Sequence, residues 1–122
     1  MELGKKQTLY VVKKVEFGVY LGDSPEAGAE SRVLLPAKQV PEGAEKGTAI
    51  RVFLYKDSRD RLIATTAEPA LQAGEFALLK VKEVGRIGAF LDWGLEKDLL
   101  LPYREQTKKL HAGEEVLAGL YV

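Results

Sequence analysis

Hydrophobic and polar residues alternate in short runs along the chain, with a period of two instead of the longer period of a helix. The clearest run covers residues 48–55, where Ile50, Val52 and Leu54 fall on one side and their neighbours on the other. Such alternation is typical of a β-strand with one buried face. In the first half of the chain the pattern predicts five strands, at about residues 7–16, 18–22, 32–36, 48–56 and 61–66.

The first expected strand breaks this period of two, because its apolar residues are spaced three apart. The same spacing recurs in the second half of the chain; the two sets are Leu9, Val12 and Val15, and Leu78, Val81 and Val84. A strand whose buried face changes along its length needs a bulge or strong coiling, as at the corner of a small barrel. We therefore expect a bulge or strong coiling in both copies of this strand.

The whole pattern occurs twice. Leu34-Leu35-Pro36 returns as Leu100-Leu101-Pro102, and from Pro36 onward the offset is constant at 66 residues, as between Gly47 and Gly113. Before Pro36 the offset is 69 to 70 residues, because the loop between the second and third strands is longer in the first copy. A period this long indicates tandem domains, not a solenoid. The expected domains are residues 1–67 and 68–122.

Five short strands with this spacing fit the OB-type Greek-key barrel. The expected fold is therefore all-β, with two tandem five-stranded OB barrels. By the 66-residue offset the fifth strand of the second copy would fall at about residues 127–132, beyond Val122, so we expect the second barrel to lack its last strand. Either the chain is a fragment of a longer protein, which is the favoured interpretation, or a partner or neighbouring segment covers the open edge.

A glycine turn leads into the second strand of both copies, as Phe17-Gly18-Val19-Tyr20 and as Ile87-Gly88-Ala89-Phe90. Gly47, the alternating strand after it and Asp57 continue the motif. This order resembles the S1-type RNA-binding domain, whose members carry a Phe-Gly-x-Phe turn, a later glycine and an Asp turn. The tandem arrangement is similar, more specifically, to the conserved virulence factor B family. That resemblance implies a bacterial RNA-binding protein built from several S1-like modules followed by a winged-helix module. Residues 1–6 contain no apolar signal region, so the expected location is the cytoplasm.

OB folds bind single-stranded nucleic acid by stacking bases on exposed aromatic rings while basic side chains follow the backbone. The candidate RNA-binding residues of the first copy are Phe17, Tyr20, Phe53, Tyr55, Lys14, Arg32 and Arg51. Those of the second copy are Phe90, Lys82 and Arg86. The alternative is that several of these rings pack in the core or between domains, since aromatic residues are major packing residues.

Charge limits how strongly such a protein binds nucleic acid. The chain has 18 basic and 18 acidic residues; residues 1–66 hold 11 basic and 9 acidic ones, a difference of +2, and residues 67–122 hold 7 and 9, a difference of −2. A strong nucleic-acid binder is usually much more basic. The first copy is therefore the better host for a polyanion, and we expect weak binding.

The sequence offers no catalytic or metal-binding constellation. It contains no cysteine, its one histidine is His111 in a polar loop, and it has no Gly-rich phosphate loop. We therefore expect no enzyme activity, no metal and no cofactor. The expected function is a non-catalytic module that binds single-stranded RNA in the cytoplasm, without membrane contact. The alternative is a protein- or ribosome-docking module that uses the same surface.

Overall fold

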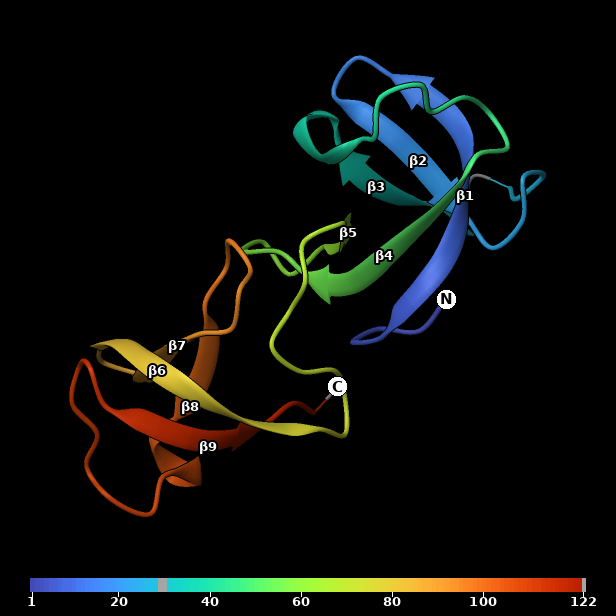
Figure 1. The fold of residues 1–122 in the computed structure, drawn as a ribbon. Helices are drawn as coiled ribbons and strands as arrows, with labels where there is room; N and C mark the ends of the chain where they lie inside the picture. The colour runs from blue at the N-terminus through green and yellow to red at the C-terminus, as the bar shows by residue number, and fades with distance from the viewer. Residues whose placement is uncertain (29–30, 122) are drawn as a thin grey trace. The chain divides into compact units, whose positions relative to one another are not determined.

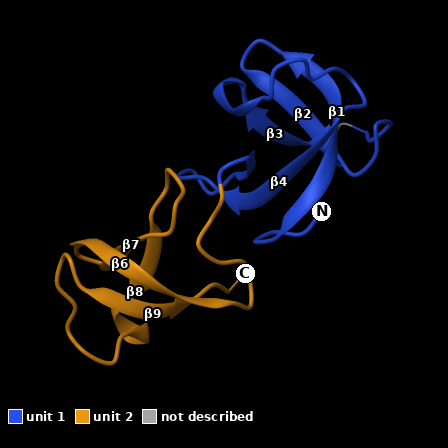
Figure 2. Ribbon diagram, in the orientation of Figure 1, with its two compact units in different colours: residues 1–67 blue, residues 68–122 orange. Residues whose placement is uncertain are grey.

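The computed structural model describes residues 1–28 and 31–121 of the chain. Two compact units follow each other along the sequence, Met1–Ala67 and Glu68–Val122 (Figure 2). The regular elements are strands, joined by loops and short 3-10 turns. Within the described residues no helix has the length and apolar character needed to cross a membrane. The expectation of an all-β fold is confirmed.

The first unit is a closed five-stranded barrel (Figure 1). Its strands are β1 (Lys6–Val15), β2 (Gly18–Gly22), β3 (Val33–Pro36), β4 (Ala49–Lys56) and β5 (Leu62–Thr65). The order around the barrel is β1-β2-β3-β5-β4; the pair β3–β5 is parallel and the other pairs are antiparallel. A 3-10 turn, η2 (Ala37–Gln39), follows β3. Every expected strand is present, with ends within a residue or two of the predicted ones.

The second unit repeats four of the five strands. It consists of β6 (Phe76–Val84), β7 (Gly88–Asp92), β8 (Leu99–Pro102), η3 (Tyr103–Glu105) and β9 (Glu115–Gly119). Their order is β8-β7-β6-β9, which matches the first unit except that no strand of the described residues joins β8 to β9. The expected loss of the last strand is confirmed, and the second sheet stays open where the first unit is closed by β5.

The expected bulge lies at the same place in both first strands. The pairing of β1 with β2 shifts between Val11 and Lys13, and that of β6 with β7 shifts between Val81 and Glu83. Val11 and Val81 are anchored alike, because each accepts a backbone hydrogen bond from a glycine that precedes the fourth strand of its unit, Gly47 at 2.7 Å and Gly113 at 2.9 Å.

This anchoring corrects the alignment of the two first strands. Val11 matches Val81, an offset of 70 residues, so Leu9 matches Leu79 and not Leu78. Leu79 is 3% exposed, like buried Leu9, whereas Leu78 is 65% exposed. The expected match of Leu78, Val81 and Val84 to Leu9, Val12 and Val15 was therefore wrong by one residue. The spacing of three predicted a bulge or strong coiling, and a bulge is present, but it did not predict the residue at which the strand changes its register.

The turn after β4 depends on one carboxylate. The side chain of Asp57 accepts backbone hydrogen bonds from Arg59 and Arg61 at 2.9 Å and a side-chain bond from Arg61 Nε at 3.0 Å. These bonds, chiefly the one from the Arg61 backbone, hold the pKa of Asp57 below its ordinary value, because they favour the charged form. Asp57 thus fixes the reversal that sends β5 back into the barrel.

Gly18 and Gly88 let the second strand of each unit lie against the third. They have φ values of +151° and +154°, which side chains rarely adopt. A β-carbon on Gly18 would lie 2.2 Å from the Leu35 carbonyl oxygen, and one on Gly88 would lie 2.3 Å from that of Leu101. Both neighbours are backbone atoms of a paired strand, so they cannot move away without breaking the pairing.

Gly18→Ala is therefore expected to destabilise the first unit by about 3 kcal/mol or more, since it combines backbone strain with a steric clash. Gly47→Ala is the matched control. Gly47 also has a positive φ, but nothing lies within 4 Å of an added β-carbon, so its change costs about 1–2 kcal/mol. Urea unfolding followed by circular dichroism measures both, and equal losses would contradict the close approach of β2 to β3.

Candidate nucleic-acid interface

Two aromatic rings lie on the outer surface of β1, β2 and β3. Tyr20 on β2 is directly opposite Lys13 on β1 and Leu34 on β3, so these three side chains project from the same side of the sheet. Phe17, in the turn before β2, is 57% exposed and meets the Tyr20 ring edge-on, with 6.2 Å between ring centroids. The pair offers an aromatic surface to solvent.

Basic side chains flank these rings on both neighbouring strands. Lys13 lies on β1, is exposed, and is the cross-strand neighbour of Tyr20 on β2. Arg32 directly precedes β3, two residues before Leu34, so strand alternation places it on the same side. Its Nε is buried and has no hydrogen-bond partner in the described part of the chain. Phe17, Tyr20, Lys13 and Arg32 together are called the β1–β3 face below.

Sequence reasoning chose Lys14 and missed Lys13. After the bulge Lys14 is opposite Val19, which is buried in the barrel, so Lys14 projects from the other side of the strand. There it forms an exposed ion pair with Glu45 at 3.5 Å. The signal that identifies Lys13 is the position of the bulge, which decides which of two adjacent lysines shares a side with Tyr20.

The remaining candidates of the first unit lie on β4. Arg51 is exposed and directly opposite Thr8 on β1, away from the β2 strand that carries Tyr20. Tyr55 is half-buried and its ring stacks on Phe53, with centroids 6.4 Å apart. Phe53 is only 1% exposed. Its expected role as an exposed stacking ring is therefore wrong, because a buried ring has no open face for a base.

The second unit has the same face with the opposite charge. Phe90 stands at the position of Tyr20, with Glu83 and Leu100 directly opposite it. Glu83 thus replaces Lys13. Asp98, one residue before β8, replaces Arg32, and exposed Ile87 replaces Phe17. The second unit keeps one aromatic ring on this face but has two carboxylates, Glu83 and Asp98, in place of the two cations of the first unit, and carboxylates repel phosphate.

The two basic candidates of the second unit, Lys82 and Arg86, do not restore the positive charge that Lys13 and Arg32 give to the first unit. Lys82 is the bulge residue and forms an ion pair with Asp98, with 3.1 Å between Nζ and Oδ1. The hydrogen bond from Lys82 to Asp98 raises the pKa of this lysine above its ordinary value. Arg86 is exposed in the turn between β6 and β7. Lys82 and Asp98 thus offset each other's charge on this face.

Residues 3–67 and 73–122 each match the profile of the family described as "S1 domain". The chain belongs to the S1 domain family. Both matches cover the barrel strands described above, including the glycine turn into β2 and β7. The second S1 domain matches although the described residues supply only four of its strands.

Two further proteins are similar to this chain, and the chain spans less than half the length of each. The chain is 33% identical over 102 residues to the uncharacterized protein YitL of Bacillus subtilis, and spans 33% of that protein's length. It also superposes on the crystal structure of a multidomain protein with nucleic acid binding domains from Streptococcus pneumoniae, with a TM-score of 0.76. That match has 18% identity and covers 98% of this chain and 42% of the other.

The burial of Phe53 generates a prediction for the first S1 domain. Phe53→Ala is expected to lower its free energy of unfolding by about 3–5 kcal/mol, as for other buried phenylalanines. Phe17→Ala removes the same side chain from an exposed position and is expected to change stability by less than about 0.5 kcal/mol. Thermal unfolding of the two variants separates the cases. A stable Phe53→Ala protein would show that the Phe53 ring is open to ligands.

Proposed function

We propose that the first S1 domain binds single-stranded RNA through the β1–β3 face. The observation that carries this proposal is the direct pairing of Lys13 with Tyr20, which puts a cation beside a half-buried ring that contacts the exposed ring of Phe17. In OB folds such a combination binds a base on the ring and a phosphate on the cation. The structurally similar protein from Streptococcus pneumoniae, which is described as having nucleic acid binding domains, supports the same class of ligand.

Binding through this face is weak. Each stacked base contributes roughly 1–3 kcal/mol, and the face has two rings that contact each other edge-on, so it accommodates one or two bases. Lys13 and Arg32 supply two cations for phosphate. The charge of the domain adds little, with 11 basic and 9 acidic residues in positions 1–66. The second S1 domain, with Glu83 and Asp98 on its face, contributes less still.

The proposed role is that of a non-catalytic RNA-binding module in the cytoplasm of a bacterium. The similarity to YitL and to a multidomain structure fits a module that works beside further domains, and the resemblance to the conserved virulence factor B family suggests a regulatory task. Docking on a protein or on the ribosome through the same face is the competing function. It predicts that the isolated chain does not bind RNA oligomers.

Removing a ring from the face is expected to weaken RNA binding without unfolding the domain. Tyr20→Ala and Phe17→Ala each lose a stacking surface, so each variant is expected to bind a labelled ten-nucleotide RNA more weakly than the wild type, by about 1–3 kcal/mol. Phe90→Ala, the matched change in the second S1 domain, leaves the affinity within twofold. Fluorescence anisotropy at low salt measures these affinities. No binding by the wild-type chain would favour protein docking instead.

Two adjacent lysines provide a charge test of the same face. Lys13→Glu introduces the charge found at Glu83 and is expected to weaken RNA binding at least tenfold. Lys14→Glu makes the same change in net charge on the other side of the strand and is expected to have a several-fold smaller effect. Lys13→Gln should also reduce the slope of log affinity against log salt by about 0.7, the value for one lost phosphate contact. Equal effects of Lys13→Glu and Lys14→Glu would rule out the β1–β3 face.

A further inference from the structure

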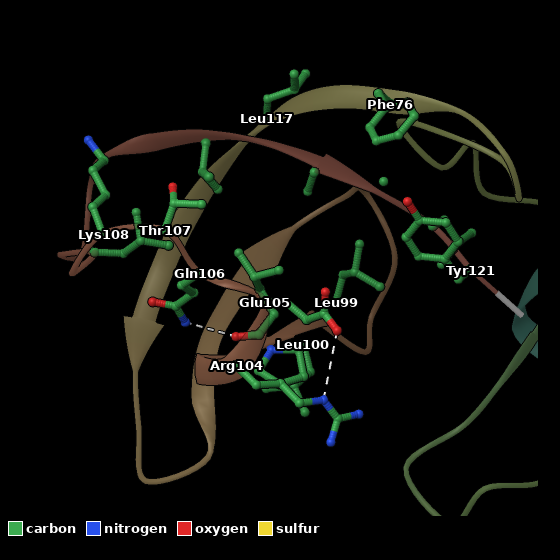
Figure 3. Close-up of a pocket in the computed structure, with 17 residues that line it drawn as sticks. Phe76, Leu99, Leu100, Arg104, Glu105, Gln106, Thr107, Lys108, Leu117 and Tyr121 are labelled. Atoms are coloured by element: carbon green, nitrogen blue, oxygen red, sulfur yellow. Dashed lines mark hydrogen bonds and ion pairs between the residues drawn. The ribbon is translucent and has the colours of Figure 1, made fainter.

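Three large apolar side chains are exposed on the outer side of β6 and β9 in the second S1 domain. Leu78 on β6 is directly opposite Leu117 on β9, and the two are 65% and 64% exposed. Phe76, two residues before Leu78 on the same strand, is also exposed, and its ring lies against Gly119. Figure 3, a close-up of the neighbouring pocket, shows the Leu117 side chain pointing away from β8. Phe76, Leu78 and Leu117 together are called the β6–β9 patch below.

The first S1 domain shows that this exposure does not depend on the fifth strand. By the corrected register, Thr8 and Arg51 take the positions of Leu78 and Leu117, and they too are exposed and directly opposite each other. They are exposed although that barrel is closed, because β5 pairs with residues 53–56 of β4 and does not reach Arg51. The second domain thus has leucines at two surface positions of the fold where the first has polar residues. Exposed apolar residues that adjoin in this way mark an interaction surface.

Two charges beside the patch indicate what covers it. Lys80 on β6 is directly opposite Glu115 on β9, on the side of the sheet that carries the β6–β9 patch. Both are exposed, and neither forms an ion pair within the described residues. One cation and one anion at the same level of two strands do not select a partner of a single charge sign. They fit a surface that presents the same two charges in exchanged order.

A second copy of this chain presents such a surface. We propose that the β6–β9 patch is the interface of a homodimer, in which a two-fold axis runs between β6 and β9 and nearly parallel to them. Leu78 then packs on Leu117 of the second copy, and Lys80 pairs with Glu115 of the second copy. Each contact occurs twice, as in any isologous interface. Two sheets that pack face to face keep their strands within about 30° of each other, which this axis allows.

The size of the patch predicts a weak dimer. Its apolar area is on the order of a few hundred Å², against roughly 800 Å² per partner in a stable complex. We therefore expect a dissociation constant on the order of 100 µM. A dimer carries two first domains, so two weak RNA sites act together at a high effective concentration. That consequence rests on the proposed function, whereas the dimer itself does not.

Sedimentation equilibrium of the full chain without RNA, from about 10 µM to 1 mM, tests the interface around the expected constant. The wild type is expected to change from monomer to dimer over this range. Leu117→Arg introduces the residue found at Arg51 and is expected to raise the dissociation constant at least tenfold. Ile87→Arg is the matched control, because Ile87 is exposed in the turn between β6 and β7. It is expected to leave the constant within twofold. Because RNA is absent, the result is independent of the proposed function.

An exchange of charges tests the two-fold arrangement. Lys80→Glu places carboxylates against each other across the interface and is expected to raise the dissociation constant at least fivefold. Adding Glu115→Lys restores the match with reversed signs and is expected to return the constant to within twofold of the wild type. Emission of Trp93, which is buried in this domain, verifies that each variant is folded. A wild-type chain that stays monomeric at the highest concentration overturns the proposal. So does a dimer that Leu117→Arg leaves intact, or a double variant that does not recover.

Discussion

One extra residue in the first strand of each S1 domain determines which side chains reach its outer face. The bulge at Val12 and at Lys82 is anchored by the hydrogen bonds of Val11 and Val81 to the turn before the fourth strand. Before the bulge, Leu9 and Val11 point into the barrel; after it, the alternation shifts by one residue. Lys13 therefore joins Tyr20 on the outside. Without the shift Lys14 would stand there, and the β1–β3 face would have different chemistry.

The two domains show how far the side chains of one face can differ on the same backbone. Their strands pair in equivalent registers, and Gly18 and Gly88 make the same close approach to the third strand. Yet Lys13 and Arg32 are replaced by Glu83 and Asp98, so the sign of the face is reversed. The fold depends on buried residues and glycines that both copies keep. Ligand choice depends on exposed residues, which can change at little cost in stability.

Much of the fold was predictable from the sequence, because alternation and turn residues are local signals and the repeat shows each of them twice. The strands, the bulges and the open second sheet follow from such signals. Residue placement at the site was harder. The buried state of Phe53 depends on what packs over the outer side of β4, and alternation alone cannot show this. Whether Lys13 or Lys14 lies beside Tyr20 depends on where the bulge shifts the strand pairing by one residue. The spacing of Leu9, Val12 and Val15 did not locate this shift, because it aligned the two first strands one residue out of register.

The central claim is that RNA contacts the β1–β3 face of the first domain and avoids the same face of the second. The most direct test is the change in backbone amide NMR shifts when a ten-nucleotide single-stranded RNA is added to the full chain. We expect the largest changes to cluster at Lys13, Phe17, Tyr20 and Arg32, while Glu83, Phe90 and Asp98 stay unchanged. Changes of similar size around Phe90, or changes confined to other surfaces, would contradict the claim.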